Sequence, residues 1–576
     1  MKKFFIGNIF PMKKFLRKNI SFYISGMVFR RKIISFLFVS LSLISFFESK
    51  AQTARPNVLL FVADDMRWNY ISHIDTNFIL NTPAINSIAE QGADIKFYTT
   101  NSVCLPSRAS IMSGLYGHNN GSMNNGQLMP HSEVRLPQLM YDNGYYVALI
   151  GKWMIEHKQP KPDFDYWLWT PNQSTYYNDT AFYFDSAVAV TEHMTDFISD
   201  SALALLSRID TPFFLIVDHN APHSPFIPQN QYANMYDSTT FPLPANFIEY
   251  TQNYPSYLYQ FDSPMLPGGY ENMLKHYIPM IKGIDEGLQK VLDELDSIGQ
   301  KDNTMIIFIS DNSYLIGDHR LQGKSYPYED CMRAPLFIRY PAWFTPGTVI
   351  DSSYSLNIDL MPTILEAAGI TDTAIIDGVS VHKVMTENFR RKEFLYEQFP
   401  QDTVYPSERT IEDDYFVYSR YFCTDTTEEL FDRKNDPLQL NNLVHHFAYL
   451  DTLIIYRNRL DSLRMVYHDT ASIDICDCSL LNPVYVNDTV TTGINGNEFS
   501  FSILPNPASN QLTVSSDQLR EFLVSIYDLL GREMFYSENN FQSSIFNLES
   551  FPSGIYFCVF TTADGKMSEQ KLVIEK

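Results

Sequence analysis

Two short segments of the sequence combine carboxylate and amide side chains in a way that suits a metal ion. Asp64 and Asp65 are adjacent, and Asp311 and Asn312 form a second pair much further along the chain. These side chains offer only oxygen ligands, and most are carboxylates, which is the preference of a hard cation such as calcium or magnesium. Aspartate after a strand is also a common turn or capping residue, so a purely local role is the alternative.

A third segment places a cysteine where a nucleophile could act. The run from Cys104 to Arg108 reads Cys-Leu-Pro-Ser-Arg, which is typical of a helix with proline in its first turn. Cys104 is therefore expected at the amino end of that helix. Free N–H groups and the positive end of the helix dipole favour an anion there, so a sulfate or phosphate would be partly stabilised beside the nucleophile. The alternative is an inert buried cysteine.

Four apolar runs predict the strands that would position these segments. They are short, rich in Val, Ile or Phe, and without strict alternation, as expected of strands buried on both faces. They span Val58–Ala63, Tyr145–Ile150, Phe213–Val217 and Met305–Ile309. Helix-like stretches such as Pro83–Gln91 and Tyr277–Leu295 separate them, which predicts an α/β domain with a mostly parallel central sheet.

Each of these runs is followed by polar side chains. The segments that follow are Asp64-Asp65, Gly151-Lys152, Asp218-His219 and Asp311-Asn312, with Pro222-His223 shortly after the third. Open α/β sheets bind ligands in the crevice beyond the carboxyl ends of their strands. The four segments are therefore predicted to converge on one site.

These residues together resemble the type I sulfatases, in which a maturation enzyme oxidises a cysteine to formylglycine before folding. The run from Cys104 to Arg108 matches the signature of that family, and the resemblance extends over about residues 54–470. Other matching segments are Asn57–Asp65, Gly151-Lys152-Trp153, Pro222–Pro225, Ser310-Asp311-Asn312, Gly317, His319, Gly323-Lys324, Tyr328-Glu329, Asp359–Thr363, Glu429–Asp432, Asp436-Pro437 and Asn442-Leu443.

The resemblance implies an alkaline-phosphatase-like fold and a role for each matching residue. By it, Ca2+ is held by Asp64, Asp65, Asp311 and Asn312 together with the modified side chain of Cys104. It also implies that Arg108, Lys152, His223 and Lys324 surround the formylglycine and the sulfate.

The chemistry implied by the resemblance begins with a hydrated aldehyde at position 104. One hydroxyl attacks sulfur, the alcohol leaves, and the second hydroxyl then drives elimination of sulfate and restores the aldehyde. Calcium and the cationic side chains neutralise the oxygens on which charge grows. The leaving alcohol needs a positioned acid, which could be either His223 or Lys324.

One position departs from the family pattern. Where many relatives read Gly-Lys-Trp-His, this chain has Met154 after Trp153. A thioether donates no proton and carries no charge, so the chain lacks a residue that contacts the formylglycine hydroxyl in relatives. Glu156 or His157 could substitute for it, and the alternative for both is a solvated loop residue.

An aromatic segment, Lys161–Asp185, follows Lys152 and is expected to be a loop. It contains Trp167, Trp169 and several tyrosines. Aromatic rings can stack on sugar faces, so one hypothesis is that Trp167 and Trp169 line a carbohydrate subsite. The competing interpretation is that these rings belong to the core.

The amino-terminal segment, residues 1–51, has the pattern of a secretory signal peptide. It holds ten Lys or Arg residues and one acid, Glu48, and its apolar run Ile33–Phe47 precedes a small-residue cleavage pattern. The run is short for a membrane span, so a retained anchor is the weaker alternative. Met27 is a second candidate start.

The charge of the chain limits its partners. The formal net charge is −23, and removal of the basic amino-terminal segment leaves the remainder more acidic. Such a charge disfavours nucleic acid and anionic lipid as general partners, so an anionic substrate requires a local basic pocket.

Six cysteines are a sparse set for an exported chain of this size. Cys476 and Cys478 are expected to form disulfides, with Cys423 or Cys331 as alternative partners.

The composition changes near residue 482. A polar stretch over 481–498 is expected to be a linker, and residues 499–576 read as short strands broken by turn signals, the pattern of a small β-sandwich. This tail resembles the type IX secretion sorting domain of Bacteroidetes-like bacteria, on Leu504–Ala508, Ile526–Arg532 and Leu548–Tyr556. The resemblance implies export by the type IX machinery to the outer surface or the medium, followed by removal of the tail. A generic β-module for adhesion or carbohydrate binding is the alternative.

The predicted organisation has five parts. They are a signal peptide (1–51), a sulfatase catalytic α/β domain (52–389), a smaller carboxy-terminal α+β subdomain (390–480), the linker (481–498) and the sorting domain (499–576). The predicted function is hydrolysis of sulfate esters. Sulfated polysaccharides or oligosaccharides are the favoured substrates because an exported enzyme meets them outside the cell, and the other implied partners are the formylglycine-generating maturase and the type IX machinery.

Two further functions stay open on the sequence. A phosphonate or phosphate ester hydrolase is one, since a formylglycine and metal site also suits phosphoryl oxygens. A catalytically silent sulfated-glycan-binding protein is the other, suggested by Met154.

Overall fold

The computed structural model describes residues 55–155, 163–171, 173–247, 265–372, 374–400, 406–422 and 427–470, and most of the strands from 501 to 576. The predicted signal peptide and linker lie outside the described residues, as do Glu156, His157, Cys423, Cys476 and Cys478. The domain boundaries at these places therefore stay predictions.

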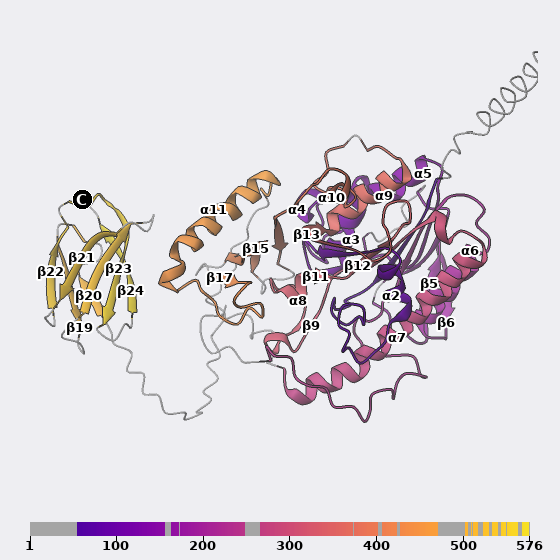
Figure 1. The fold of residues 1–576 in the computed structure, drawn as a ribbon, viewed down its shortest axis with the longest axis horizontal. Coiled ribbons are helices and arrows are strands. Elements are labelled where there is room, and N and C mark those ends of the chain that lie inside the picture. Colours follow the sequence, from indigo (N-terminus) through magenta and orange to yellow (C-terminus); the bar gives the residue numbers. More distant parts are fainter. Residues whose placement is uncertain are drawn as a thin grey trace, which may run out of the picture. The chain divides into compact units, whose positions relative to one another are not determined.

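An eleven-stranded mixed sheet lies at the centre of the larger part of the chain (Figure 1). Strand β1 (Asn57–Ala63) lies between β7 (Phe213–Asp218) and β8 (Thr304–Ser310) and is parallel to both, while β3 (Tyr146–Lys152) is parallel to β7 on its other side. Every residue of β1, β7 and β8 is buried, as expected of strands covered on both faces. The four apolar runs thus form parallel strands, as predicted, and these strands are adjacent in the sheet.

The edges of this sheet are more mixed than its centre. Beyond β8 the order is β12, β2 and β11, with β13 also paired to β2, and beyond β3 the order is β4, β5 and β6. The bounds are β12 (Leu336–Arg339), β2 (Ala93–Tyr98), β11 (Arg333–Ala334), β13 (Thr348–Leu356), β4 (Tyr166–Thr170), β5 (Asp179–Tyr183) and β6 (Ser186–Val190). A separate small ribbon pairs β9 (Leu315–Ile316) with β10 (Gln322–Gly323).

Helices cover both faces of the sheet. Leu59 and Phe61 face one helical layer, whereas Val58, Leu60 and Val62 face the other, because successive side chains of a strand point to opposite faces. The first layer contains α2 (Pro83–Glu90), α6 (Met194–Leu206) and α7 (Pro267–Ser297). The second contains α3 (Cys104–Ser113), α5 (Arg135–Asp142) and α9 (Leu360–Ala368). The predicted helix Tyr277–Leu295 is the carboxy-terminal part of the longer α7.

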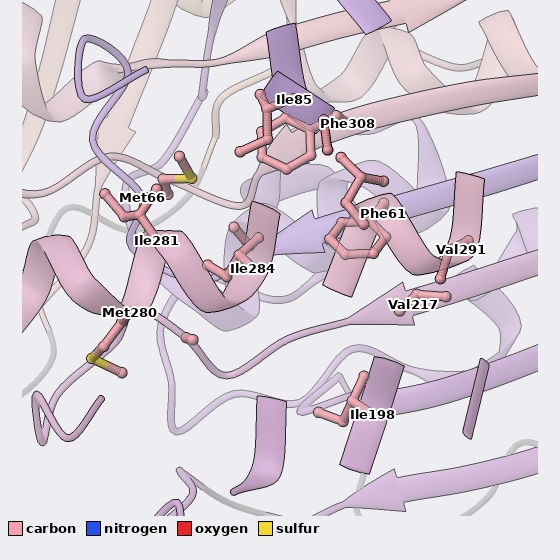
Figure 2. Close-up of a cluster of buried hydrophobic side chains, with 14 of the residues drawn as sticks. Phe61, Met66, Ile85, Ile198, Val217, Met280, Ile281, Ile284, Val291 and Phe308 are labelled. Atoms are coloured by element: carbon pink, nitrogen blue, oxygen red, sulfur yellow. The ribbon is translucent and has the colours of Figure 1, made fainter. Parts of the chain in front are cut away.

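The first layer forms a continuous apolar core (Figure 2). Phe61 of β1 and Phe308 of β8 stack with their ring centroids 6.0 Å apart. Ile281 and Ile284 of α7 and Ile85 of α2 are fully buried against this layer. Each such side chain contributes about 1.5–3 kcal/mol by leaving water, so this core holds the central strands in place.

A second, antiparallel sheet forms the predicted α+β subdomain. Its strands follow chain order: β14 (Glu393–Gln398), β15 (Ser407–Asp413), β16 (Phe416–Phe422) and β17 (Thr427–Asp432). Helix α11 (Leu450–Val466) packs on this sheet, and one core joins residues of both to Tyr98 and Tyr116 of the catalytic part. Three single-turn helices belong to the catalytic part: α4 (Gly117–Asn120), α8 (Glu329–Met332) and α10 (Lys383–Thr386).

The carboxy-terminal part consists of two small antiparallel sheets, as predicted for a β-sandwich. One has the order β18-β19-β22 and the other β21-β20-β23-β24. Leu512 and Val514 from the first sheet share one core with Ile526 and Cys558 from the second. The strands are β18 (Phe501–Leu504), β19 (Gln511–Ser516), β20 (Phe522–Asp528), β21 (Glu533–Asn539), β22 (Ser543–Asn547), β23 (Gly554–Thr562) and β24 (Met567–Ile574).

Two further observations bear on the sequence predictions. Cys331 is fully buried as a free thiol, and because Cys476 and Cys478 lie outside the described residues, the disulfides expected of them stay a prediction. None of the helices formed by the described residues combines the length and the apolarity that crossing a bilayer requires.

Gly151 lies next to Lys152, at a point where β3 and β7 approach each other closely. Its φ is +110°, and an added Cβ would lie 1.9 Å from the carbonyl oxygen of Asp218. We expect Gly151→Ala to lower the free energy of unfolding by about 2–4 kcal/mol, since both the backbone and its neighbour must shift. Gly347→Ala is the control, because Gly347 also has a positive φ, +75°, with nothing within 4 Å of the added atom. It should cost about 1 kcal/mol; equal losses in urea unfolding would contradict the close-approach argument.

The contact between the catalytic part and the subdomain depends on pH through His118. Its ring lies against the Glu397 carboxylate and the carbonyl oxygen of Tyr467. Burial lowers the pKa of His118, but Glu397 outweighs burial and raises it from 6.5 to about 9. The stabilisation is therefore complete below about pH 6.5 and is lost as the pH rises through 9.

We expect this loss to be absent in His118→Gln. Thermal unfolding of both proteins between pH 6 and pH 10 checks it, because the wild-type protein alone should lose about 2–3 kcal/mol over that interval. Parallel curves for the two proteins would show that His118 does not carry the effect.

Candidate active site

The carboxyl ends of the four parallel strands bring the predicted residues together. Asp64 and Asp65 follow β1, Asp311 and Asn312 follow β8, and Lys152 is the last residue of β3. All five side chains are fully buried. The Asp311 N–H donates to the carbonyl oxygen of Ala63 at 3.0 Å, which continues the β1–β8 pairing into the site. The convergence predicted from the strand ends is therefore observed.

Helix α3 is fixed to the end of β8. The Ser107 hydroxyl donates to the backbone carbonyl of Asp311, and Asn357 Nδ2 donates to Ser107 Oγ at 3.0 Å. Arg108 donates from Nε to Asp311 Oδ2 at 2.9 Å and from Nη1 to the Asp218 carboxylate. Cys104 is the first residue of α3, as predicted, so these contacts fix its position relative to the strand ends.

The Cys104 sulfur lies in the middle of the cluster. Its Sγ is 3.4 Å from Asp64 Oδ1, 4.0 Å from Asp65 Oδ1 and 2.5 Å from Lys324 Nζ. Lys324 Nζ also donates to Asp65 Oδ1 at 2.6 Å. The predicted helix-tip cysteine thus contacts both carboxylates and a cation.

Two more of the predicted basic side chains lie against the same carboxylates. Lys152 forms an ion pair with Asp64, and Nε2 of His223 is 3.4 Å from Asp65 Oδ2. The other ring nitrogen of His223, Nδ1, is 2.6 Å from the carbonyl oxygen of Ser224. The side chains of His223 and Lys324 are 14% and 15% exposed, so they lie at the opening of an otherwise buried cluster.

The charges of the cluster shift the titration of its members. Burial would raise the pKa of Asp64, but Lys152, His223 and Arg108 hold it at about 2. Burial raises the pKa of Asp218 to about 7 although Arg108 opposes the shift. Burial and the Asp64 carboxylate raise the pKa of the Cys104 thiol, so the unmodified side chain is a weak nucleophile in this arrangement.

The residues present fit a hard cation. Ligand atoms of Asp64, Asp65, Cys104 and His223 all lie within 4.8 Å of one another. Among the described residues, Oδ2 of Asp65 and Oδ1 of Asn312 are buried and accept no hydrogen bond. Buried oxygens need a partner, and calcium takes oxygen ligands from several side chains. The predicted ligand Asp311 lies outside this group. Its Oδ1 accepts hydrogen bonds from Asp65 N and Asn312 N, whereas its Oδ2 accepts one from Arg108 Nε and keeps a lone pair for a cation.

Two residues of the site had no role assigned to them from the sequence. Asp218, which lies in one of the four segments predicted to converge, ends β7 and pairs with Arg108. Gln173 Oε1 accepts a hydrogen bond from Lys152 Nζ at 2.9 Å. No motif marks Gln173, because it lies in the connection between β4 and β5.

The aromatic segment differs from its prediction. It forms β4 and β5 instead of a loop, because β4 pairs with β3 and continues the sheet. Trp167 is fully buried and packs edge-on against Trp153, with ring centroids 5.3 Å apart. A ring enclosed in this way presents no face to a sugar, so the core interpretation holds for Trp167. Trp169 is half-buried against the same core, and its Nε1 donates to the carbonyl oxygen of Phe184 at 3.1 Å.

Comparison with solved structures defines the class of fold first. The chain is similar to BT4656, solved in complex with its substrate D-glucosamine-2-N,6-O-disulfate, with a TM-score of 0.68, 23% identity, and 73% of this chain and 99% of that chain covered. It is also similar to the phosphonate monoester hydrolase of Agrobacterium radiobacter, with a TM-score of 0.62, 20% identity and coverage of 72% and 96%. The fold is thus that of the alkaline-phosphatase-like sulfatases, as predicted.

The family models identify the chain within that class. The Sulfatase model matches residues 56–370, so this chain belongs to the sulfatase family and is a sulfuric ester hydrolase. The model for the carboxy-terminal region of N-sulphoglucosamine sulphohydrolase matches residues 317–465. A secretion system C-terminal sorting domain matches residues 502–575, which makes the chain an exported protein directed to the cell surface or the extracellular space.

Curated relatives agree with this assignment. An N-acetylglucosamine-6-O-sulfatase of Bacteroides thetaiotaomicron is 28% identical over 482 residues, which cover 69% of this chain and 84% of the relative. The N-acetylglucosamine-6-sulfatase of Homo sapiens is 28% identical over 366 residues, which cover 58% of this chain and 65% of the relative.

Calcium should stabilise the folded protein through the cluster at the strand ends. We expect added Ca2+ to raise the unfolding temperature relative to protein in chelator, by an amount that corresponds to about 2.7 kcal/mol at a hundredfold excess over the dissociation constant. Asp65→Asn should abolish most of this increase, because it removes a buried charge that faces the other ligands. Asp200→Asn, at an exposed carboxylate on α6, is the matched control. An unchanged increase in Asp65→Asn would remove that residue from the ligand set.

Proposed function

We propose that this sulfatase uses a formylglycine made from Cys104, together with Ca2+, to hydrolyse sulfate esters of carbohydrates. The observation that carries the proposal is the position of Cys104 at the tip of α3, within 4.0 Å of both Asp64 and Asp65 and in contact with Lys324. The raised pKa of the thiol argues that the unmodified cysteine is not the reacting group. A hydrated aldehyde at position 104 would supply the hydroxyl that attacks sulfur, and bound calcium would withdraw charge from the sulfate oxygens.

The side chains around position 104 have separate roles in this proposal. Asp64, Asp65, Asp311 and Asn312 hold the cation. Lys152 and Arg108 supply positive charge at fixed positions, because their side chains are fully or almost fully buried and do not rearrange with the solvent. Fixed charge of this kind stabilises growing negative charge without reorganisation, which is usually the largest catalytic effect.

Proton transfer is assigned to the two basic side chains at the opening of the cluster. His223 and Lys324 are the partly exposed members of the cluster and so can meet the leaving alcohol as it departs. Either one can donate a proton to that oxygen. Lys324 also contacts the sulfur at position 104, so it can serve the nucleophile as well.

The favoured substrates are sulfated amino sugars within extracellular polysaccharides or their oligosaccharides. Curated relatives from a bacterium and from human are both named as sulfatases of N-acetylglucosamine 6-sulfate. An exported protein meets such polymers outside the cell. A formylglycine-generating maturase and the type IX secretion machinery are the partners that this route requires.

A phosphonate or phosphate ester hydrolase is the second candidate, since the phosphonate monoester hydrolase shares the fold. Rates on matched sulfate and phosphate esters of one phenol separate the two. A faster sulfate ester supports the proposal, and a faster phosphate ester replaces it.

The central test compares the chemical state of residue 104 with the release of sulfate. Protein co-expressed with a maturase should release sulfate from glucosamine 6-sulfate, and its peptide containing residue 104 should carry an aldehyde by mass spectrometry. Cys104→Ala should reduce release to background, a loss of at least about 10³-fold, while its unfolding temperature stays close to that of the wild-type protein. A converted protein that binds the sugar but releases no sulfate would favour a silent glycan-binding protein, and full activity with an intact thiol would refute the proposed nucleophile.

A further inference from the structure

Gln173 lies between Lys152 and the residue at which this chain departs from its family. Its Oε1 accepts a hydrogen bond from Lys152 Nζ at 2.9 Å. Its Nε2 points to the sulfur of Met154 at 3.8 Å. Gln173 is half-buried, whereas Lys152 beneath it is fully buried. One carboxamide therefore contacts a cation of the site and the methionine beside it.

The Nε2 group has hydrogen-bonding capacity left over. Among the described residues its partner is the Met154 thioether, which is a weak acceptor. An amide N–H gains little from such a partner and more from an anionic oxygen, because hydrogen bonds to charged groups are roughly twice as strong. The group is thus ready to donate to an anion that approaches Lys152.

The segment that carries Gln173 is held to the His223 segment. The hydroxyl oxygen of Tyr176 lies 2.9 Å from the carbonyl oxygen of Asn220 and 2.7 Å from that of His223. The Tyr176 side chain is almost fully buried and stacks on His193. Asp179 accepts hydrogen bonds from Ser174 Oγ and Thr175 N, which orders the intervening turn. The carboxamide is therefore held on a fixed support beside the site.

We propose that Gln173 is an additional substrate-binding residue, which orients Lys152 through Oε1 and donates from Nε2 to a sulfuryl oxygen of the bound ester. It would supply a hydrogen bond on the side of the site where many relatives have a histidine and this chain has Met154. A carboxamide transfers no proton, so its contribution is binding and orientation. This inference rests on the proposed sulfate ester hydrolysis.

Two substitutions distinguish the role of the acceptor from that of the donor in the Gln173 carboxamide. Gln173→Met removes both hydrogen bonds at similar volume, and Gln173→Glu keeps an acceptor for Lys152 but replaces the donor with a negative charge that faces the sulfate. We expect kcat/KM for glucosamine 6-sulfate to fall about 10- to 100-fold in Gln173→Met, as for loss of a hydrogen bond to a charged group, and further in Gln173→Glu. Gln289→Met, on the exposed face of α7, is the control and should retain wild-type rates.

A rescue experiment distinguishes binding from a merely structural effect. Adding Met154→His to Gln173→Met should recover at least part of the lost activity, because histidine returns a donor to the same side of the site. A structural defect at residue 173 would not be repaired by that change. Failure of the rescue together with a lowered unfolding temperature in both Gln173 variants would overturn the proposal.

Measuring the affinity of an inactive variant for the sugar tests the role of Gln173 independently of the proposed function. In a Cys104→Ser background, calorimetry with glucosamine 6-sulfate should show weaker affinity when Gln173→Met is added, by the same 10- to 100-fold factor. Unchanged affinity, or rates within twofold of the wild-type protein in Gln173→Met, would refute a role for Gln173. A wild-type protein with a converted residue 104 that hydrolyses no sulfate ester would instead refute the proposed function, whatever the binding result.

Discussion

The compensation of buried carboxylates by buried cations is the constraint on which the rest of this structure depends. Asp64, Asp65, Asp218 and Asp311 lie together at the ends of parallel strands, where water cannot solvate them. Arg108 by itself forms ion pairs with three of these carboxylates, those of Asp64, Asp218 and Asp311, and so joins α3 to β1, β7 and β8. Removing one partner from such a group leaves an uncompensated charge in the interior, which typically costs 3–5 kcal/mol. The fold and the site therefore cannot be altered independently.

The second sheet contributes to the site through the segment that carries Lys324. Glu329, five residues later, accepts a hydrogen bond from Tyr98 and forms an ion pair with Arg433, which follows β17. The Glu329 backbone N–H donates to Gln439 Oε1 at 2.7 Å. The carboxy-terminal family model begins at residue 317, before that sheet starts, and so includes Lys324. The subdomain thus acts as a support for one wall of the site.

Much of this architecture could be predicted because it follows from local patterns. Apolar runs without alternation identify strands buried on both faces, and the polar residues after them identify the ligand-binding edge. The Cys-Leu-Pro-Ser-Arg run likewise identifies the start of α3 and the position of Cys104. These signals lie within single segments of the chain.

The features that could not be predicted depend on contacts between segments. Trp167 is buried because β4 pairs with β3, and aromatic composition alone cannot distinguish a core ring from an exposed one. Gln173 lies at the site because Tyr176, in the same β4–β5 connection, donates a hydrogen bond to the carbonyl oxygen of His223. No residue type or spacing predicts that contact. The pairing of Arg108 with Asp218 likewise follows from where α3 lies across the sheet.

Every residue of α3 is buried, and the Cys104 side chain has no exposed surface. Another macromolecule cannot reach that side chain in the native state, so the proposed conversion of Cys104 to formylglycine would have to occur on the nascent or unfolded polypeptide. Modification and folding are then kinetic competitors. Substitutions or growth conditions that accelerate folding would increase the share of molecules that are correctly folded yet permanently unmodified, and a purified preparation could be structurally uniform while chemically mixed.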